Sequence, residues 1–250
     1  MAWQDRDYNR EDTSSGVSRS GGGYGWSMPP IGQLAVVLMA VCVGMFIATG
    51  PAQAGVARRY GALTLMDGLA WRQPWRWIVY QYLHANGAHL LFNLVGMYCF
   101  VPMVERAWGW KRTLGFYTLG GIAAGAAYIV MVAITGRASD IVGASGSLMA
   151  CMGAAAMVYP RAMVFGVLPI RVAVGLYGAF YLLSSLLGHD LADACHLGGL
   201  VFGLLASPGT PWFRKLGIKY EAWQAAREFE QEQQEQGEID RILAKVHAQG

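Results

Sequence analysis

The sequence predicts an all-α membrane protein, a bundle of six transmembrane helices with a polar cytoplasmic tail at each end. Hydrophobic residues make up 54% of the 250 residues and charged residues only 14%, which departs from soluble proteins in the direction of membrane proteins. The 33 glycines fit this class, because membrane helices use small residues to pack closely. The formal net charge of +3 is too small to indicate nucleic-acid binding.

The membrane domain is expected at residues 28–208, between two polar tails. Residues 1–27 are rich in Ser and Gly and bury too little apolar surface to fold alone, so we expect this tail to be disordered. Its acidic residues argue against a transit peptide, and its polar start is wrong for a cleaved signal sequence. Residues 209–250 form the second tail, in which 218–246 are predicted to be a charged, Gln-rich helix outside the membrane. The six apolar segments between the tails lie at 31–49, 78–104, 113–135, 141–158, 172–188 and 190–207.

The distribution of basic residues predicts how these six segments are oriented, because basic residues concentrate on the cytoplasmic side of a membrane. The first tail, the loops after segments two and four and the start of the second tail together hold eleven: Arg6, Arg10, Arg19, Arg106, Lys111, Arg112, Arg161, Arg171, Arg214, Lys215 and Lys219. The opposite loops hold five: Arg58, Arg59, Arg72, Arg76 and Arg137. Both termini are therefore expected in the cytoplasm.

Polar side chains lie near the outer ends of segments two, four and six, which all cross the bilayer in the same direction. Segment two holds His84, His89 and Asn93, segment four holds Ser145, and segment six holds Asp193 and His196. Polar groups at membrane depth are costly unless they are paired or face a cavity. Three helices with one direction place these groups at a similar depth, so they predict a functional site toward the outer leaflet.

Ser145 is the candidate nucleophile of this site and His196 its candidate base. Ser145 lies between Gly143 and Gly146 in an uncharged run, where a hydroxyl serves either helix packing or chemistry. A serine becomes a good nucleophile only when a base takes its proton, and histidine is the usual base. Glycines 199 and 203 follow His196 at helical spacing and would let its helix approach closely.

Acyl transfer also needs hydrogen-bond donors aimed at the developing oxyanion. His89 and Asn93 lie four residues apart, hence on one helix face, and both can donate. The backbone N–H of Ser145 at the start of a helix adds a third donor.

Each of these residues also has a structural interpretation that the spacing alone leaves open. His196 alone is more often a satisfied interior histidine, and Asn93 alone is more often a hydrogen bond between helices. Asp193, one turn before His196, would suit a third triad member, but an acid near the membrane surface needs no special role, and that second interpretation is favoured. Cys195 points about 100° away from His196 on a helix and is interpreted as packing. The four cysteines show no paired spacing and are interpreted as small buried hydrophobic residues.

From about Ile31 to Ala206 the chain resembles the rhomboid intramembrane serine proteases. The resemblance rests on several motifs in order: Trp75-Arg76, His84-x4-His89-x3-Asn93, Glu105-x-x-Trp108-Gly109-x-x-Arg112, Gly143-x-Ser145-Gly146 with Ala150 and Gly153, and His196 with Gly199 and Gly203. It implies a six-helix rhomboid-like bundle in which the residue matching Ser145 is the nucleophile and that matching His196 the base. It implies oxyanion-hole roles for His89 and Asn93, and structural roles for His84 and for the Trp75, Arg76, Glu105 and Arg112 positions.

The chain departs from the family pattern at two positions. Family members often carry an aromatic residue, stacked against the base, where Met149 stands, and an alanine where Cys195 stands. Met149 leaves open what packs against His196. The stretch 238–246 is similar to a segment that follows the membrane core in some bacterial members and commonly continues further, so the sequence leaves open whether its end is truncated.

The resemblance implies a serine endopeptidase that hydrolyses peptide bonds in or near transmembrane segments of membrane proteins, using a Ser-His dyad and an oxyanion hole. The alternative is a catalytically inactive rhomboid-like protein that binds membrane clients. No broken-helix repeat of a transporter and no His-Glu-x-x-His of a metalloprotease occurs in the sequence. No metal or organic cofactor is implied. The expected partners are transmembrane protein substrates and the lipid bilayer, and the expected location is a cell membrane, the inner membrane of a bacterium, with both termini cytoplasmic.

Overall fold

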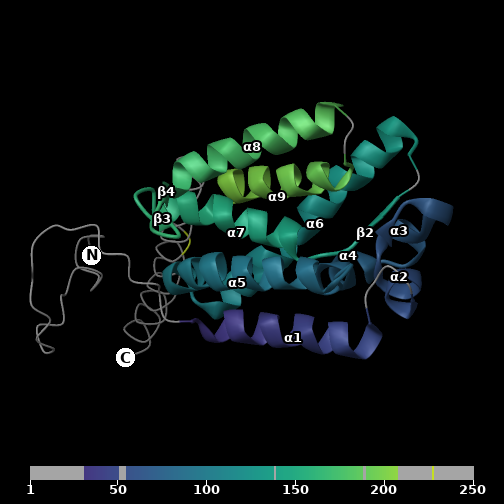
Figure 1. Cartoon of the computed structure of the whole chain (residues 1–250), viewed down its shortest axis with the longest axis horizontal. Helices are drawn as coiled ribbons and strands as arrows, with labels where there is room; N and C mark the ends of the chain where they lie inside the picture. Colours follow the sequence, from purple (N-terminus) through teal and green to yellow (C-terminus); the bar gives the residue numbers. More distant parts are fainter. Residues whose placement is uncertain (1–30, 51–54, 138, 188–189, 208–226, 228–250) are drawn as a thin grey trace, which may run out of the picture.

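The described part of the chain is a bundle of long helices lying side by side (Figure 1). The computed structural model describes residues 31–50, 55–137, 139–187, 190–207 and 227. The tail expected to be disordered at residues 1–27 and the charged helix expected at residues 218–246 lie outside these described residues, apart from residue 227.

Among the described residues, six apolar helices follow the order of the six expected segments. Three are long and apolar enough to cross a membrane, and these are α5 (Gly87–Trp108), α6 (Trp110–Thr135) and α8 (Ile170–Leu187). Three are shorter, and these are α1 (Gln33–Thr49), α7 (Ser145–Val158) and α9 (Ala192–Ala206). At 1.5 Å per residue the 14 residues of α7 extend about 21 Å, less than the roughly 30 Å of a hydrocarbon core. The described part of the chain is mostly helical, and by length and composition three of its helices are candidate membrane spans.

The sequence predicted that the second apolar segment begins at residue 78, but the long helix of this segment begins later. Residues there form two short turns, α4 (Arg76–Val79) and η4 (Tyr80–Tyr82), and the long helix α5 begins only at Gly87. Asn86 caps α5, because its backbone is extended and its side-chain oxygen accepts a hydrogen bond from the His89 N–H at 2.8 Å. His84 therefore lies in the loop before α5 and not on the second helix.

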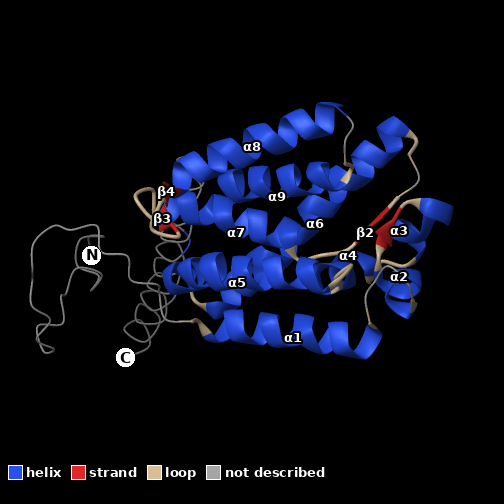
Figure 2. Cartoon of the chain, in the orientation of Figure 1, coloured by secondary structure: helices blue, strands red, loops and turns tan. Residues whose placement is uncertain are grey.

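Short strands occur at two other places, and one of them replaces expected helix. The expected segment 141–158 becomes α7 only from Ser145, because Asp140–Ile141 form β2, which pairs antiparallel with β1 (Leu63–Thr64). A second antiparallel pair, β3 (Met163–Val164) and β4 (Leu168–Pro169), connects α7 to α8 (Figure 2). The expectation of an all-α fold thus holds for the bundle, with two-residue strands in its loops.

The first loop contains three further short elements, and a buried arginine ties it together. The elements are α2 (Val56–Gly61), η3 (Met66–Gly68) and α3 (Leu69–Arg72). Arg76 is 1% exposed; its Nη1 donates to the Ala62 carbonyl at 2.5 Å and its Nη2 donates to the Arg59 carbonyl. The Trp75 indole donates to the Tyr60 carbonyl at 3.0 Å. These bonds agree with the structural role that the resemblance implied for the Trp75-Arg76 pair.

The sixth apolar helix packs on the fourth through glycines. Ten of the 14 residues of α7 are buried, so α7 is the centre of the bundle. A Cβ atom on Gly199 of α9 would overlap the carbonyl oxygen of Gly146, and one on Gly203 would overlap that of Ala150. In return, a Cβ atom on Gly153 of α7 would lie 2.9 Å from the Leu200 carbonyl oxygen. The two helices therefore meet backbone to backbone.

We expect Gly199→Val to insert into the membrane but to lose the reactivity of Ser145, because the branched side chain must push α9 away from α7. A shift of about 1 Å at a reacting centre can cost around a hundredfold in rate. The measurement is labelling of Ser145 by a fluorophosphonate probe in purified protein. Leu200 is 2% exposed and too buried to serve as a control, whereas Leu205, 57% exposed on the same helix, is suitable. Labelling of Gly199→Val as fast as of Leu205→Val would contradict the expectation.

Candidate active site

Ser145 and His196 are brought into hydrogen-bond contact across the α7–α9 interface. Ser145 is the first residue of α7, and its Oγ lies 2.7 Å from the Nε2 of His196 on α9. Both residues are half-buried. This distance is within the range at which a base can take a proton from a nucleophilic hydroxyl.

The loop before Ser145 is held by Tyr80, a residue that the sequence analysis did not single out. Gly143 has φ +130°, a conformation that favours glycine, and its N–H donates to the Tyr80 carbonyl at 2.8 Å. The Tyr80 hydroxyl donates to the Gly121 carbonyl of α6 at 2.6 Å and lies 3.9 Å from the Sγ of Cys195. Tyr80 thus connects α6, α9 and the loop that aims the serine. Nothing in the local pattern distinguishes this tyrosine from the other aromatic residues nearby.

A second serine, Ser147, is engaged elsewhere. It is 1% exposed, and its hydroxyl donates to the Oε1 of the fully buried Gln81 at 2.9 Å. The Gln81 amide in turn donates to the Trp77 carbonyl at 2.8 Å. Of the two serines in the glycine-rich stretch, Ser145 is therefore the one that faces a base, while Ser147 fixes α7 to the first loop.

His89 lies against the loop that carries Ser145. A Cβ atom on Gly143 would be 2.8 Å from the Cε1 and Nε2 atoms of His89 and 3.7 Å from the Oγ of Ser145, so both groups flank this glycine. The backbone N–H of Ala85 donates to the His89 Nδ1 at 3.4 Å, which leaves Nε2 as the ring nitrogen beside Gly143. His89 is thus placed as the sequence predicted, next to the candidate nucleophile.

Asn93 lies one turn further along α5 and is 3% exposed. Its Nδ2 donates to the His89 carbonyl at 2.7 Å, and its Oδ1 has no hydrogen-bond partner among the described residues. Gly96, three residues on, approaches Leu148 of α7, so Asn93 is on the face of α5 that turns toward α7. One amide hydrogen of Asn93 remains for another acceptor.

His84 packs against His89 from the loop before α5. It is 1% exposed, and the two imidazole rings are 5.3 Å apart and nearly perpendicular. Burial, with a smaller contribution from His89, lowers the pKa of His84 to about 4, so this imidazole is neutral at physiological pH. A neutral ring packed on His89 suits a structural role.

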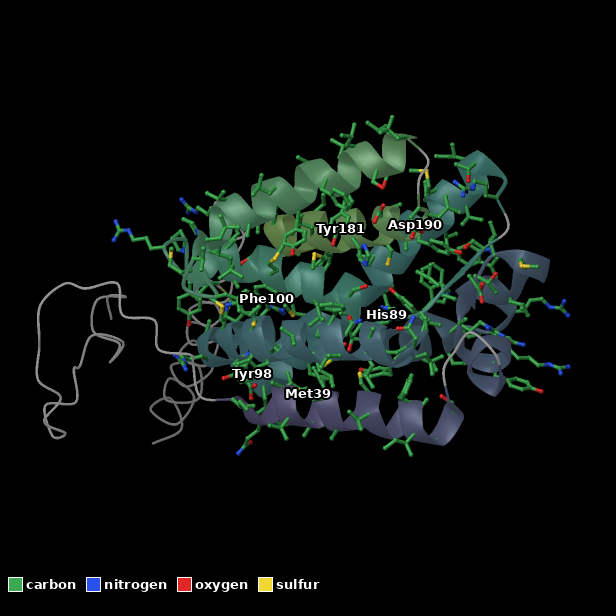
Figure 3. The ribbon with its side chains drawn as sticks, in the orientation of Figure 1. Met39, His89, Tyr98, Phe100, Tyr181 and Asp190 are labelled. Atoms are coloured by element: carbon green, nitrogen blue, oxygen red, sulfur yellow. The ribbon has the colours of Figure 1, made fainter. Side chains whose placement is uncertain are left out.

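An aromatic ring does contact the candidate base, but it comes from α8. The ring centroid of Tyr181 lies 4.7 Å from that of His196, with the planes inclined at 42°. Tyr181 is labelled in Figure 3. Met149, at the position where the family pattern often has an aromatic residue, is partly buried in the core around α7. The sequence could not identify Tyr181, because this contact joins two helices and no spacing within α8 announces it.

Asp193 is buried beside the base. It is 8% exposed, its Oδ1 is 3.6 Å from the Nδ1 of His196, and its Oδ2 accepts a hydrogen bond from Ser184 of α8. The sequence alone favoured an acid without a special role at this position, and the structure shows a carboxylate that is buried beside the imidazole. Within the described part of the chain, no group of three His, Cys, Asp or Glu side chains is arranged to hold a metal ion.

Comparison with known proteins points to one family. A family model described as the rhomboid domain matches residues 71–211. The chain is 25% identical over 184 residues to the rhomboid protease GlpG of Yersinia pseudotuberculosis serotype I, covering 70% of this chain and 61% of that relative. It is 27% identical over 197 residues to the rhomboid protease GlpG of Haemophilus influenzae, covering 70% of this chain and 88% of that relative. The chain thus spans less than two thirds of the length of its Yersinia relatives.

We expect Tyr181→Leu to slow the reaction of Ser145 with a fluorophosphonate by about tenfold, because the imidazole loses the ring that limits its rotation. Tyr181→Phe keeps the ring and should label at the rate of the intact chain. Equal rates for the Leu and Phe variants would show that this aromatic contact does not position the base.

Proposed function

The chain belongs to the rhomboid family, and from this premise we propose that it is a serine endopeptidase that cleaves membrane proteins in or near their transmembrane segments. The observation that carries the proposal is the 2.7 Å contact between the Oγ of Ser145 and the Nε2 of His196. A hydroxyl paired with an imidazole at the end of a buried helix has the arrangement of an activated nucleophile.

In the proposed reaction, Ser145 Oγ attacks the carbonyl carbon of the scissile peptide bond while His196 Nε2 accepts the hydroxyl proton. The tetrahedral intermediate collapses, the C–N bond breaks, and the imidazolium gives its proton to the leaving amine. Water then attacks the acyl-enzyme ester while His196 accepts its proton. The C–O bond to Ser145 breaks, the imidazolium gives the proton to the Ser145 Oγ, and the carboxylic acid product leaves.

The oxyanion of the tetrahedral intermediate needs donors on the side of α5. We assign this role to the imidazole of His89, the free amide hydrogen of Asn93 and the backbone N–H of Ser145. The position of His89 beside Gly143 and Ser145 supports the assignment, as does the place of Ser145 at the N-terminus of α7. Each such donor is worth on the order of 10²–10³ in rate in serine hydrolases with preorganised sites.

The inactive rhomboid-like alternative gains no support from the described site. Loss of the nucleophile or of the base would favour it, and both are present and in contact. We therefore keep the protease as the single proposed function.

The proposed setting is a multi-pass protein of a cell membrane, with six spans and both termini in the cytoplasm. Its substrates are then membrane proteins that reach the site from the bilayer. The eleven-to-five distribution of basic residues supports this orientation.

We expect Ser145→Ala and His196→Ala each to abolish cleavage of a model transmembrane substrate, because nucleophile and base act as a unit and the loss of either removes nearly the whole effect. Substrate cleavage on gels and fluorophosphonate labelling are measured side by side on folded, detergent-solubilised protein. Ser147→Ala, which removes the neighbouring hydroxyl, is the matched control and should still label. Full cleavage by either the Ser145 or the His196 variant would exclude the mechanism.

We expect cysteines placed at Met66 and at Val167 to label from opposite sides of the membrane, in a background without the four native cysteines. Met66 is 51% exposed in the first loop and Val167 is 80% exposed in the β3–β4 connection, so both positions accept a probe. Right-side-out vesicles and an impermeant maleimide should label the Met66→Cys site and spare the Val167→Cys site. Labelling of both sites from one side would rule out the six-span topology.

A further inference from the structure

We propose that Asp193 is a positioning residue for His196. Its carboxylate would be the third member of the site, after Ser145 and His196, and Ser184 of α8 holds that carboxylate in place. The inference rests on the proposed function, because it concerns how the base of the same reaction is oriented. In a two-residue Ser-His mechanism the imidazole has no partner other than the serine. Here we give the Nδ1 of His196, which faces away from Ser145, a carboxylate partner.

The first line of support is the environment of the imidazole. One ring nitrogen, Nε2, contacts Ser145 at 2.7 Å, and the other, Nδ1, has no hydrogen-bond partner among the described residues. The Oδ1 of Asp193, one helical turn earlier on α9, lies 3.6 Å from this Nδ1. This separation is too long for a hydrogen bond, but catalytic hydrogen bonds are often long in the absence of substrate and tighten only when substrate is bound.

The two oxygens of the Asp193 carboxylate face different partners, which is the second observation in support. Its Oδ2 accepts from the Ser184 hydroxyl, which leaves Oδ1 directed toward His196. Asp193 and Ser184 are 8% and 9% exposed, so this arrangement lies inside the bundle and not at its surface. A carboxylate at this depth is costly unless it is paired, and the imidazole on the same helix face is one of its partners beside the Ser184 hydroxyl.

The chemistry that follows is specific. A carboxylate that accepts a hydrogen bond from Nδ1–H selects the tautomer whose Nε2 lone pair points at the Ser145 hydroxyl. Once the proton has moved, the negative charge of Asp193 stabilises the imidazolium. The carboxylate stays ionised throughout and exchanges no proton itself.

A purely structural role makes a different prediction. Asp193 lies in the first turn of α9, where a negative charge stabilises a helix through its dipole. In that case its removal would lower thermal stability and leave kcat unchanged. The two roles are therefore separated by measuring kcat, KM and the melting temperature of the same variants.

The test is Asp193→Asn, which keeps the shape of the side chain and an oxygen for the Ser184 hydroxyl but removes the charge. Replacing the triad aspartate in trypsin-like enzymes by asparagine lowers kcat about 10⁴-fold. Because the contact here is longer, we expect a fall in kcat of between about tenfold and a thousandfold, with KM within about twofold and an unchanged melting temperature. Asp190→Asn removes an exposed carboxylate just before α9 and should leave kcat unchanged.

Ser184→Ala provides a second, independent readout. It should lower kcat by a smaller factor, and it should have no further effect when combined with Asp193→Asn, because Ser184 acts through the carboxylate. If Asp193→Asn does not fold, a fall in kcat at constant KM in Ser184→Ala supports the proposal, and an unchanged kcat overturns it.

A kcat of Asp193→Asn within about threefold of the intact chain, or a loss confined to the melting temperature, would also overturn the positioning role. The intact chain and Ser145→Ala are assayed in parallel. Absence of cleavage by the intact chain refutes the proposed protease itself, whereas equal cleavage by the intact chain and Asp193→Asn refutes only the role of Asp193.

Discussion

The close approach of α9 to α7 is the contact on which the rest of the site depends. Gly199 rests directly on the backbone of Gly146, and Gly203 one turn later rests on that of Ala150. In an apolar solvent no hydrophobic force holds two helices together, so packing of small residues sets their distance. That distance in turn decides whether His196 reaches Ser145. The glycines thus carry the geometry of the reaction although they contribute no reacting group.

Buried polar side chains then fix the parts of the chain that are not helical. Irregular backbone at membrane depth is tolerated only where protein satisfies its polar groups. Arg76 binds the carbonyls of the first loop, Gln81 and Ser147 link that loop to α7, and Tyr80 connects it to α6 and to Gly143. These hydrogen bonds surround the first turn of α7. Ser145 is therefore held in place by the first loop on one side and by α9 on the other.

The comparison of sequence and structure shows which features are local enough to predict. Ser145, His196 and His89, which lie close together in the structure, could be proposed from the sequence because each belongs to a short motif on one helix or helix start. The sequence placed the start of the second segment at residue 78, nine residues before α5 begins at Gly87. The residues before Asn86 are apolar like those of the helix, but the N-cap at Asn86 determines where the helix begins. Tyr181 and Ser184 were missed because their partners lie on α9, and contacts between helices leave no periodic trace in either one.

The two missed residues lie three apart on α8, hence on one face, and both lie beside His196 or its neighbour Asp193. Tyr181 covers the ring of His196, and Ser184 holds the carboxylate beside it. The opposite face of α8 carries exposed apolar side chains such as Leu183 and Leu186, as expected of a helix against lipid. The imidazole is therefore bounded by three elements: α7 through the Ser145 hydroxyl, α9 through the Asp193 carboxylate, and α8 through the Tyr181 ring. Since Tyr181 and Ser184 both belong to α8, a displacement of that helix would alter the ring contact and the carboxylate contact together.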